Sequence, residues 1–263
     1  MSKAAGGKQP KTPSKKAAKT PPKKQAKASP RKQPKAPPEK RSSAQRSIIP
    51  PGQVDTPQRR RDIMVAASEL FAAHGYHGVS VRDIARRANV PIALCSYYFG
   101  KKQELFLALF EQNRSSIEDR IGAIEEVSRN LDTPSSLERL VRSWAEPIAL
   151  QQNMSGDEVF HILTARALWD PAEEAQAAVE QYFDPVAKAF IRTLGAILPN
   201  RKPEDLVWGY EWAVGALLMF VMDRRIKRLS ANLAVPADRT QIDNFVRFVC
   251  AGLRALPASG RRV

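Results

Sequence analysis

The sequence predicts an all-α protein, with a three-helix unit near the N-terminus and a larger helical body behind it. Apolar residues recur every three or four positions from residue 56 onward, which is the spacing of one helix face. Helix starts are marked by a capping residue followed by proline, as at Thr56-Pro57 and Asp170-Pro171. Residues 80–102 form two short apolar-faced segments with a tight turn between them. We therefore expect about nine helices.

Residues 1–52 form a basic tail rich in Lys, Pro and Ala. Residues 1–46 hold twelve Lys and three Arg against Glu39 alone, which accounts for +14 of the formal charge of +15. Such a segment buries too little apolar surface to offset its chain entropy, so we expect disorder. It is expected to hold DNA phosphates nonspecifically. A solubilising extension with no dedicated role is the alternative.

The first helix is expected over 56–74, with Thr56 as its N-cap and Pro57 as its first residue. One face is apolar and should pack inside the three-helix unit. It consists of Ile63, Ala66, Ala67, Leu70 and Phe71.

The next two helices have the pattern of a helix-turn-helix, a motif whose second helix enters the DNA major groove. Ser80 is placed to cap the first of them. Asn89 tolerates the left-handed conformation that ends a helix, and Pro91 suits the first position of the next one. Leu94 should point inward, and Gly100 should close the second helix. The apolar face of the first helix is Val81, Ile84, Ala85 and Ala88.

Residues 56–110 resemble the DNA-binding domain of tetracycline-repressor-type (TetR) bacterial regulators. The resemblance rests on IMVAASELFAAHGYHGVSVRDIARRANV and then YYFGKKQELF. This chain departs from the usual pattern at Val81 (commonly Thr), Asn89 (commonly Gly) and Ser96 (commonly Tyr). The resemblance implies a DNA-binding domain over 53–112 with its motif at 81–100. It also implies a helical effector-binding and dimerisation domain over 113–257, before a short tail at 258–263.

Candidate DNA contacts lie on both helices of the motif. Ile92, Ala93, Ser96 and Tyr97 should face base edges or the sugar-phosphate backbone, and Arg82 the backbone. The resemblance implies phosphate contacts from Ser80, Tyr98 and Lys102. The reading face carries no Arg, Lys, Asn or Gln, so specificity should come from thymine methyls, Ser96 or DNA shape.

The body should contain a linking helix over 102–126 and five further helices. These are expected over 135–152, 157–169, 170–198 (interrupted near Asp184-Pro185), 203–229 and 238–256, the last starting at Asp238.

A ligand cavity and a dimer interface are expected within these helices. The expected effector contacts are Phe160, His161, Arg166, Trp169, Phe183, Trp208 and Trp212, although plain core packing would explain the aromatic ones equally. Their character suggests a largely apolar effector. The expected dimer contacts are Gly215, Leu218, Met222, Phe245 and Val249, with burial inside one subunit as the alternative.

These features together predict a homodimeric repressor that a small effector releases from a palindromic operator in double-stranded DNA. An architectural, histone-like protein led by the basic tail is the alternative. An enzyme is not expected, since the chain has three histidines and no HExxH, GxSxG, Walker or CxxC motif. We expect no cofactor and no metal. Cys95 and Cys250 form no motif. The sequence contains no run of eighteen apolar residues, so a transmembrane helix is not expected. The resemblance implies a bacterial, cytoplasmic and nucleoid-associated protein. The operator, the regulated genes, the effector and the sign of regulation stay open.

Overall fold

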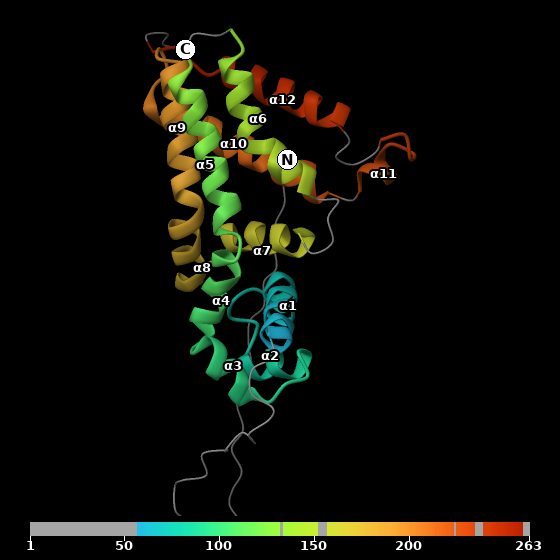
Figure 1. The fold of residues 1–263 in the computed structure, drawn as a ribbon. Coiled ribbons are helices and arrows are strands. Elements are labelled where there is room, and N and C mark those ends of the chain that lie inside the picture. Colours follow the sequence, from blue (N-terminus) through green and yellow to red (C-terminus); the bar gives the residue numbers. More distant parts are fainter. Residues whose placement is uncertain (1–56, 132–133, 152–156, 224, 235–238, 260–263) are drawn as a thin grey trace, which may run out of the picture. The chain divides into compact units, whose positions relative to one another are not determined.

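The computed structural model describes residues 57–131, 134–151, 157–223, 225–234 and 239–259. The expectations for the basic tail, Thr56 and Asp238 lie outside these ranges. The described residues belong to one compact unit, and apart from an isolated bridge between Arg201 and Ala258 their regular structure is helical (Figure 1). The elements are α1 (Pro57–His74), α2 (Val81–Arg87), α3 (Ile92–Phe99), α4 (Lys102–Glu111), α5 (Arg114–Arg129), α6 (Ser136–Gln151), α7 (Asp157–Trp169), α8 (Glu173–Ala178), a π-helical turn η1 (Val179–Phe183), α9 (Asp184–Ile197), α10 (Pro203–Met222), α11 (Ile226–Leu229) and α12 (Arg239–Arg254).

The all-α prediction is confirmed, but three of the nine expected helices are divided. The first division separates α4 from α5 inside the expected 102–126 helix. Asn113 sits at the break with φ −104° and ψ 9°, and its side-chain amide donates to the carbonyl of Leu109. Asn competes in this way for backbone groups that would otherwise continue a helix.

The second division is the π-helical turn between α8 and α9, where an interruption was expected. Pro185 lies in the first turn of α9 and has no N–H to donate to the preceding turn. The Asp184 N–H bonds back to Val179 instead of to the carbonyl four residues earlier. The bulge rotates Val179 and Phe183 to the lining of a pocket described below.

The third division shortens the expected 203–229 helix, because α10 ends at Met222. The carboxylate of Asp223 accepts hydrogen bonds from the backbone and guanidinium N–H groups of Arg225. Asp223 itself has an extended ψ of 100°, so the chain leaves the helix there and re-forms one turn as α11.

The three-helix unit is built around Phe71, Ile84 and Leu94, which the sequence predicted to be buried, and around Phe106 of α4, which it did not. Phe71 and Phe106 meet edge to face with ring centroids 5.0 Å apart. Ile84 and Leu94, from α2 and α3, are fully buried beside them. Asn89 turns the chain at φ 53°, as expected. Pro91 precedes α3 as its N-cap and is not its first residue, because its ψ of 138° is not helical.

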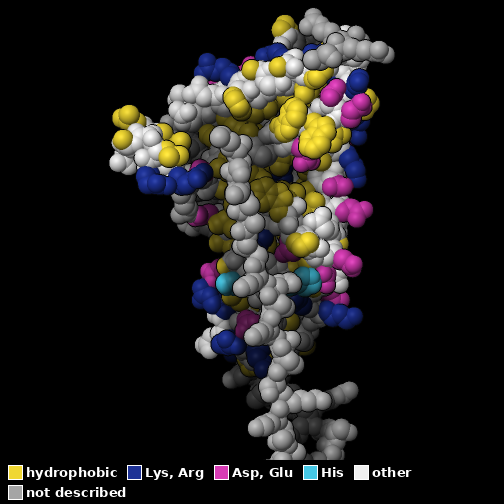
Figure 2. Space-filling model, turned by 180° about the vertical axis from the view of Figure 1, so that it is seen from behind, with side chains coloured by type: hydrophobic (Ala, Val, Ile, Leu, Met, Phe, Trp, Pro, Cys, Tyr) yellow, Lys and Arg dark blue, Asp and Glu magenta, His cyan; other side chains and the backbone are white. Residues whose placement is uncertain are grey.

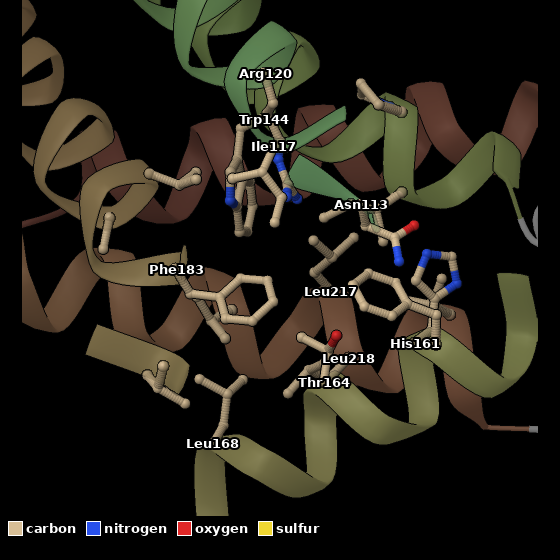
Figure 3. Close-up of a pocket in the computed structure, with 18 of the residues that line it drawn as sticks. Asn113, Ile117, Arg120, Trp144, His161, Thr164, Leu168, Phe183, Leu217 and Leu218 are labelled. Atoms are coloured by element: carbon tan, nitrogen blue, oxygen red, sulfur yellow. The ribbon is translucent and has the colours of Figure 1, made fainter. Parts of the chain in front are cut away.

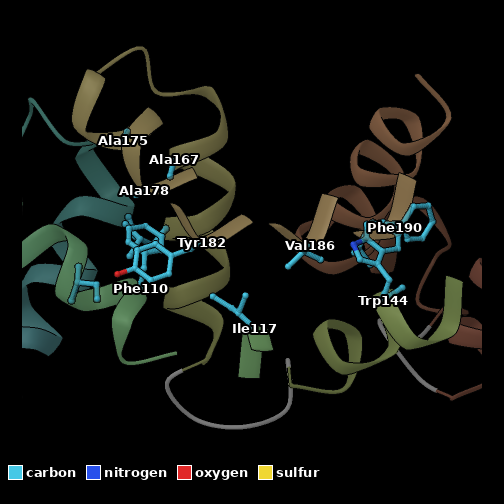
Figure 4. Close-up of a cluster of buried hydrophobic side chains, with 14 of the residues drawn as sticks. Phe110, Ile117, Trp144, Ala167, Ala175, Ala178, Tyr182, Val186 and Phe190 are labelled. Carbon is cyan, nitrogen blue, oxygen red and sulfur yellow. The ribbon is translucent and has the colours of Figure 1, made fainter. Parts of the chain in front are cut away.

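The body forms a second group of buried rings, shown in Figure 4. Phe110 stacks on Tyr182 at a centroid distance of 5.8 Å, and Trp144 meets Phe190 at 5.2 Å. In Figure 1, α5 and α9 run side by side, and α7 lies next to α1. The α1–α7 contact joins the three-helix unit to the body.

Among the described helices, α10 alone is long and apolar enough to cross a membrane by length and composition. Only 22% of its most apolar window is buried. A single helix of this kind is weak evidence for a membrane span, because the core helix of a soluble protein passes the same test.

Candidate nucleic-acid interface and effector pocket

The outer face of α3 is exposed where the sequence predicted contact with DNA. Ile92 is 49% exposed and Tyr97 61%, and Ala93 and Ser96 are exposed beside them. Leu94, Cys95 and Phe99 are buried on the opposite side and anchor α3 to the unit. Burial raises the pKa of the Cys95 thiol, so this cysteine is an unreactive core residue.

The start of α2 is fixed by a reciprocal cap. The Ser80 hydroxyl accepts from the Asp83 N–H, and the Asp83 carboxylate accepts from the Ser80 N–H. The hydrogen bonds from Ser80 lower the pKa of Asp83. Arg86 pairs with Asp83, whereas exposed Arg82 forms no ion pair among the described residues. Arg82 is therefore available for the contact with the DNA backbone that the sequence predicts.

The polar groups of two predicted phosphate contacts, Lys102 and Tyr98, are bonded or enclosed within the protein. The ammonium of Lys102 donates to the carbonyls of Tyr76 and Val79 and lies 3.9 Å from the centroid of the Tyr76 ring. Two of its three protons hold the α1–α2 connection, so at most one is left for phosphate. The hydroxyl of Tyr98 is enclosed, so in this conformation it does not offer a donor to DNA.

A pocket of about 360 Å³ lies in the body, between α5, α6, α7, α9 and α10. In Figure 3, Arg120 and Trp144 enter it close together, and Asn113 and His161 lie on another side. Phe183, Leu168 and Leu217 contribute apolar surface. The volume is within the range of small-molecule sites, about 300–1,000 Å³.

Four of the seven predicted effector contacts line this pocket, namely Phe160, His161, Trp169 and Phe183. The other three do not line it. Trp208 and Trp212 are 58% and 63% exposed and stack on each other on the outer side of α10. A helix that is apolar on most of its circumference does not show from sequence which side is inward.

Arg166 is the third predicted effector contact that lies outside the pocket lining. Its Nε donates to the carbonyl of Ala72, and its guanidinium also reaches the carbonyl of Ala73. It therefore caps the C-terminal end of α1, where unpaired carbonyls attract a cation. The carboxylate of Asp170, one turn further, accepts from the Tyr76 N–H at 2.9 Å.

The sequence analysis missed Arg120 and Tyr210 as pocket residues. Arg120 follows Ile117 by three residues and precedes Ile124 by four, so it lies on the apolar face of α5. A cation on such a face is the signal that could have identified it. Tyr210 is buried, and this burial is the largest cause of the raised pKa of its hydroxyl.

The predicted dimer contacts on α12 are buried inside one chain, which was the stated alternative. Phe245 and Val249 are 8% and 5% exposed and pack within this chain, Phe245 against Phe220. Of the three predicted contacts on α10, Leu218 and Met222 line the pocket in the body, and Gly215 lies on the open side.

The outward side of α10 and α12 instead carries a continuous apolar stripe, which we call the outer stripe. Its members recur at intervals of one to four residues along each helix. Six of them border a groove of about 520 Å³, namely Trp212, Ala216, Phe248, Ala251, Gly252 and Ala255. Figure 2 shows apolar side chains gathered on the upper part of one face of the molecule. The outer stripe consists of Trp208, Trp212, Gly215, Ala216 and Met219 on α10, and Phe248, Ala251, Gly252 and Ala255 on α12.

No group of three or more His, Cys, Asp or Glu side chains suited to a metal ion occurs within the described ranges.

Comparison with known proteins places both parts of the chain in one family. Residues 63–109 match the family described as bacterial regulatory proteins, tetR family, and residues 146–252 match a tetracyclin repressor-like C-terminal domain.

Similar sequences carry related names. The chain is 38% identical over 56 residues to the HTH-type transcriptional activator FasR of Mycolicibacterium smegmatis, covering 21% of this chain and 26% of that protein. It is 30% identical over 78 residues to the HTH-type transcriptional repressor AcnR of Corynebacterium efficiens, covering 28% and 42%. The matched segments therefore span well under half of these relatives.

Solved structures share the fold at low identity. A putative fatty acid metabolism regulator of Clostridium perfringens superposes with a TM-score of 0.54 at 20% identity, over 73% of this chain and 97% of that one. The hemolysin II transcriptional regulator HlyIIR superposes with a TM-score of 0.50 at 19% identity, over 76% and 97%. The two family matches, one to the helix-turn-helix unit and one to the helical body, show that this chain belongs to the TetR family of bacterial regulatory proteins.

Proposed function

We propose that this protein is a DNA-binding transcriptional regulator that acts as a homodimer and responds to a small ligand. The observation that carries the proposal is the exposed face of α3, held outward by buried Leu94, Cys95 and Phe99. A short helix with one anchored side and one free side is the geometry that major-groove reading requires.

Dimerisation is supported by the outer stripe. Phe248 is 71% exposed and Trp212 63%, which is unusual for such large apolar side chains. A Cβ on Gly215 would meet nothing within 4 Å, so the backbone there is open to close approach by another helix. A second copy would cover this surface isologously. The two α3 helices would then meet successive major grooves about 34–36 Å apart.

Ligand control is supported by the two sides of α7. One side, with Phe160, His161 and Thr164, lines the pocket. Arg166, on another side, holds the end of α1. A ligand that displaces α7 therefore has a direct route to the three-helix unit. A coupling of only about 1–3 kcal/mol changes DNA affinity five- to 150-fold.

We propose repression, with release by the ligand, as the mode of action. A dimer bound across a promoter blocks other proteins by occupancy alone, and this needs no further activating contact. The named relatives include both an activator and a repressor, so the mode is a proposal for this chain.

Genome-wide footprinting with the full chain and with a chain lacking residues 1–52 tests the proposal. We expect the same discrete, two-fold symmetric sites from both proteins, with weaker overall retention for the shortened one. Loss of every discrete site on removing residues 1–52 would show that the tail, and not α3, reads DNA.

A further inference from the structure

Arg120 is a cation of the pocket lining that has no hydrogen-bond or ion-pair partner among the described residues. Arg120 projects from α5 into the pocket beside Trp144 (Figure 3). Its Nε is enclosed and forms no hydrogen bond, and the guanidinium forms no ion pair with any described residue. Burial lowers the pKa of Arg120, although nearby Tyr210 partly opposes this. An enclosed charge without a counter-ion is costly, so its presence calls for an explanation.

The acidic residues of the pocket do not supply that counter-ion. Asp184 pairs with Lys188, whose Nζ lies 3.2 Å from its carboxylate. Glu211 is exposed to solvent. No hydrogen bond or ion pair joins either acid to Arg120 among the described residues. The guanidinium therefore faces the cavity with its fork of donors unused.

The rest of the lining suits an apolar body with few polar groups. Phe160, Phe183 and Leu217 come from three different helices and surround the cavity. The hydroxyl of Thr164 on α7 belongs to the same lining and is enclosed without a hydrogen-bond partner among the described residues. Most of a bound molecule would therefore contact hydrocarbon and aromatic surface.

We propose that the effector is an amphipathic acid, whose single carboxylate binds the Arg120 guanidinium and whose apolar body fills the cavity between α7, α9 and α10. The inference deepens the proposed function, because it assumes that this pocket is the effector site. The planar fork of a guanidinium matches the two oxygens of a carboxylate. The bound carboxylate would supply the counter-ion that Arg120 lacks among the described residues.

Calorimetric titration of the full chain with three probes of equal length tests the charge of the effector. The probes are decanoate, decan-1-ol and decylammonium, which differ only in the head group. We expect decanoate to bind at least about tenfold more tightly than either of the others, since a charge-assisted hydrogen bond contributes about 1.5–3 kcal/mol. Equal binding of the alcohol, tighter binding of the cation, or no binding of any probe would overturn the proposal.

A matched pair of variants locates the head group. Arg120→Gln keeps a polar side chain but removes the charge, and Arg129→Gln makes the same change at an exposed position of α5. We expect Arg120→Gln to lose at least about tenfold in decanoate affinity and to leave decan-1-ol affinity unchanged. Arg129→Gln should leave both affinities unchanged. Unchanged decanoate affinity in Arg120→Gln would contradict the assignment of the carboxylate to Arg120. If that variant misfolds, the comparison of the three probes on the wild-type protein still tests the proposal.

The titration contains no DNA, so it separates this inference from the proposed function. Arg120-dependent acid binding that never alters DNA affinity would keep the inference about the pocket and contradict ligand control. DNA release by a neutral ligand, with no acid binding, would keep ligand control and contradict the inference.

Discussion

The Nε of Arg166 lies 2.9 Å from the carbonyl oxygen of Ala72, although 94 residues separate them. Arg166 belongs to α7, which lines the pocket proposed for the effector, and Ala72 belongs to the last turn of α1 in the three-helix unit. This bond ties the part of the chain expected to bind a ligand to the part expected to bind DNA.

Replacing Arg166 by Met should loosen the end of α1 without unfolding the protein. Two hydrogen bonds to α1 carbonyls are lost at once, because the guanidinium binds Ala73 as well as Ala72. We expect a loss of about 1 kcal/mol in the free energy of unfolding. Hydrogen exchange should accelerate selectively in residues 70–79. Arg192, which pairs with Glu125 at an exposed position, provides the control. Arg192→Met should lower the free energy of unfolding by less than about 0.5 kcal/mol and leave hydrogen exchange in residues 70–79 unaltered.

Gly75 and Gly122 should respond in opposite directions to alanine. Gly75 has φ 73°, and a Cβ there would lie 2.9 Å from a carboxylate oxygen of Asp170. We expect Gly75→Ala to destabilise the protein by about 1–3 kcal/mol. Gly122 lies inside α5 with nothing within 4 Å of an added Cβ, so Gly122→Ala should stabilise by up to about 1 kcal/mol. Chemical denaturation measures both, and equal effects would refute this interpretation of the α1 turn.

Acid should weaken the protein partly through Glu111. Hydrogen bonds from Arg114 and Tyr182 lower the pKa of Glu111 from 4.5 to about 2. A depressed pKa means that this contribution is complete above about pH 4.5 and is lost as the pH falls toward 2. Glu111→Gln should therefore flatten the decline of stability over that range. Glu118→Gln alters a longer contact to the same Arg114, at 3.6 Å, and should leave the profile close to wild type.

A charge in the outer stripe should separate the dimer. Phe248→Glu would place a carboxylate in the apolar contact that we propose between two copies, and desolvating it is costly. We expect dissociation to monomers at micromolar concentration in analytical ultracentrifugation, with helical content retained. Leu233→Glu, at a side chain 88% exposed and away from the stripe, should stay dimeric. A wild-type monomer, or a Phe248→Glu dimer, would contradict the interface.

The local features of the fold were predictable because they depend on neighbours in sequence. The bounds of α7, the left-handed Asn89 and the buried Leu94 all follow from periodicity and capping. The breaks at Asn113 and Asp223 were missed, since each depends on a side chain that competes with the helix backbone for hydrogen bonds.

The orientation of the body helices was not predictable to the same degree. Trp212 and Phe245 are both apolar and helical, yet one faces outward and the other inward. Only the packing of α10 against α12 and α6 decides between these orientations. Arg120 was not predicted as a pocket residue, because helical periodicity assigns its face of α5 to the core and gives no role to a single cation there.

Selection of bound duplexes from random DNA tests the central claim most directly, with the chain lacking residues 1–52 and its Ser96→Arg variant compared side by side. If the outer face of α3 reads DNA twice in a dimer, the shortened chain will enrich a two-fold symmetric sequence with half-sites about one helical turn apart. Ser96→Arg will change the preferred bases at equivalent positions of both half-sites, since Arg favours guanine. Enrichment of no sequence, or the same sequence from both proteins, would contradict the account.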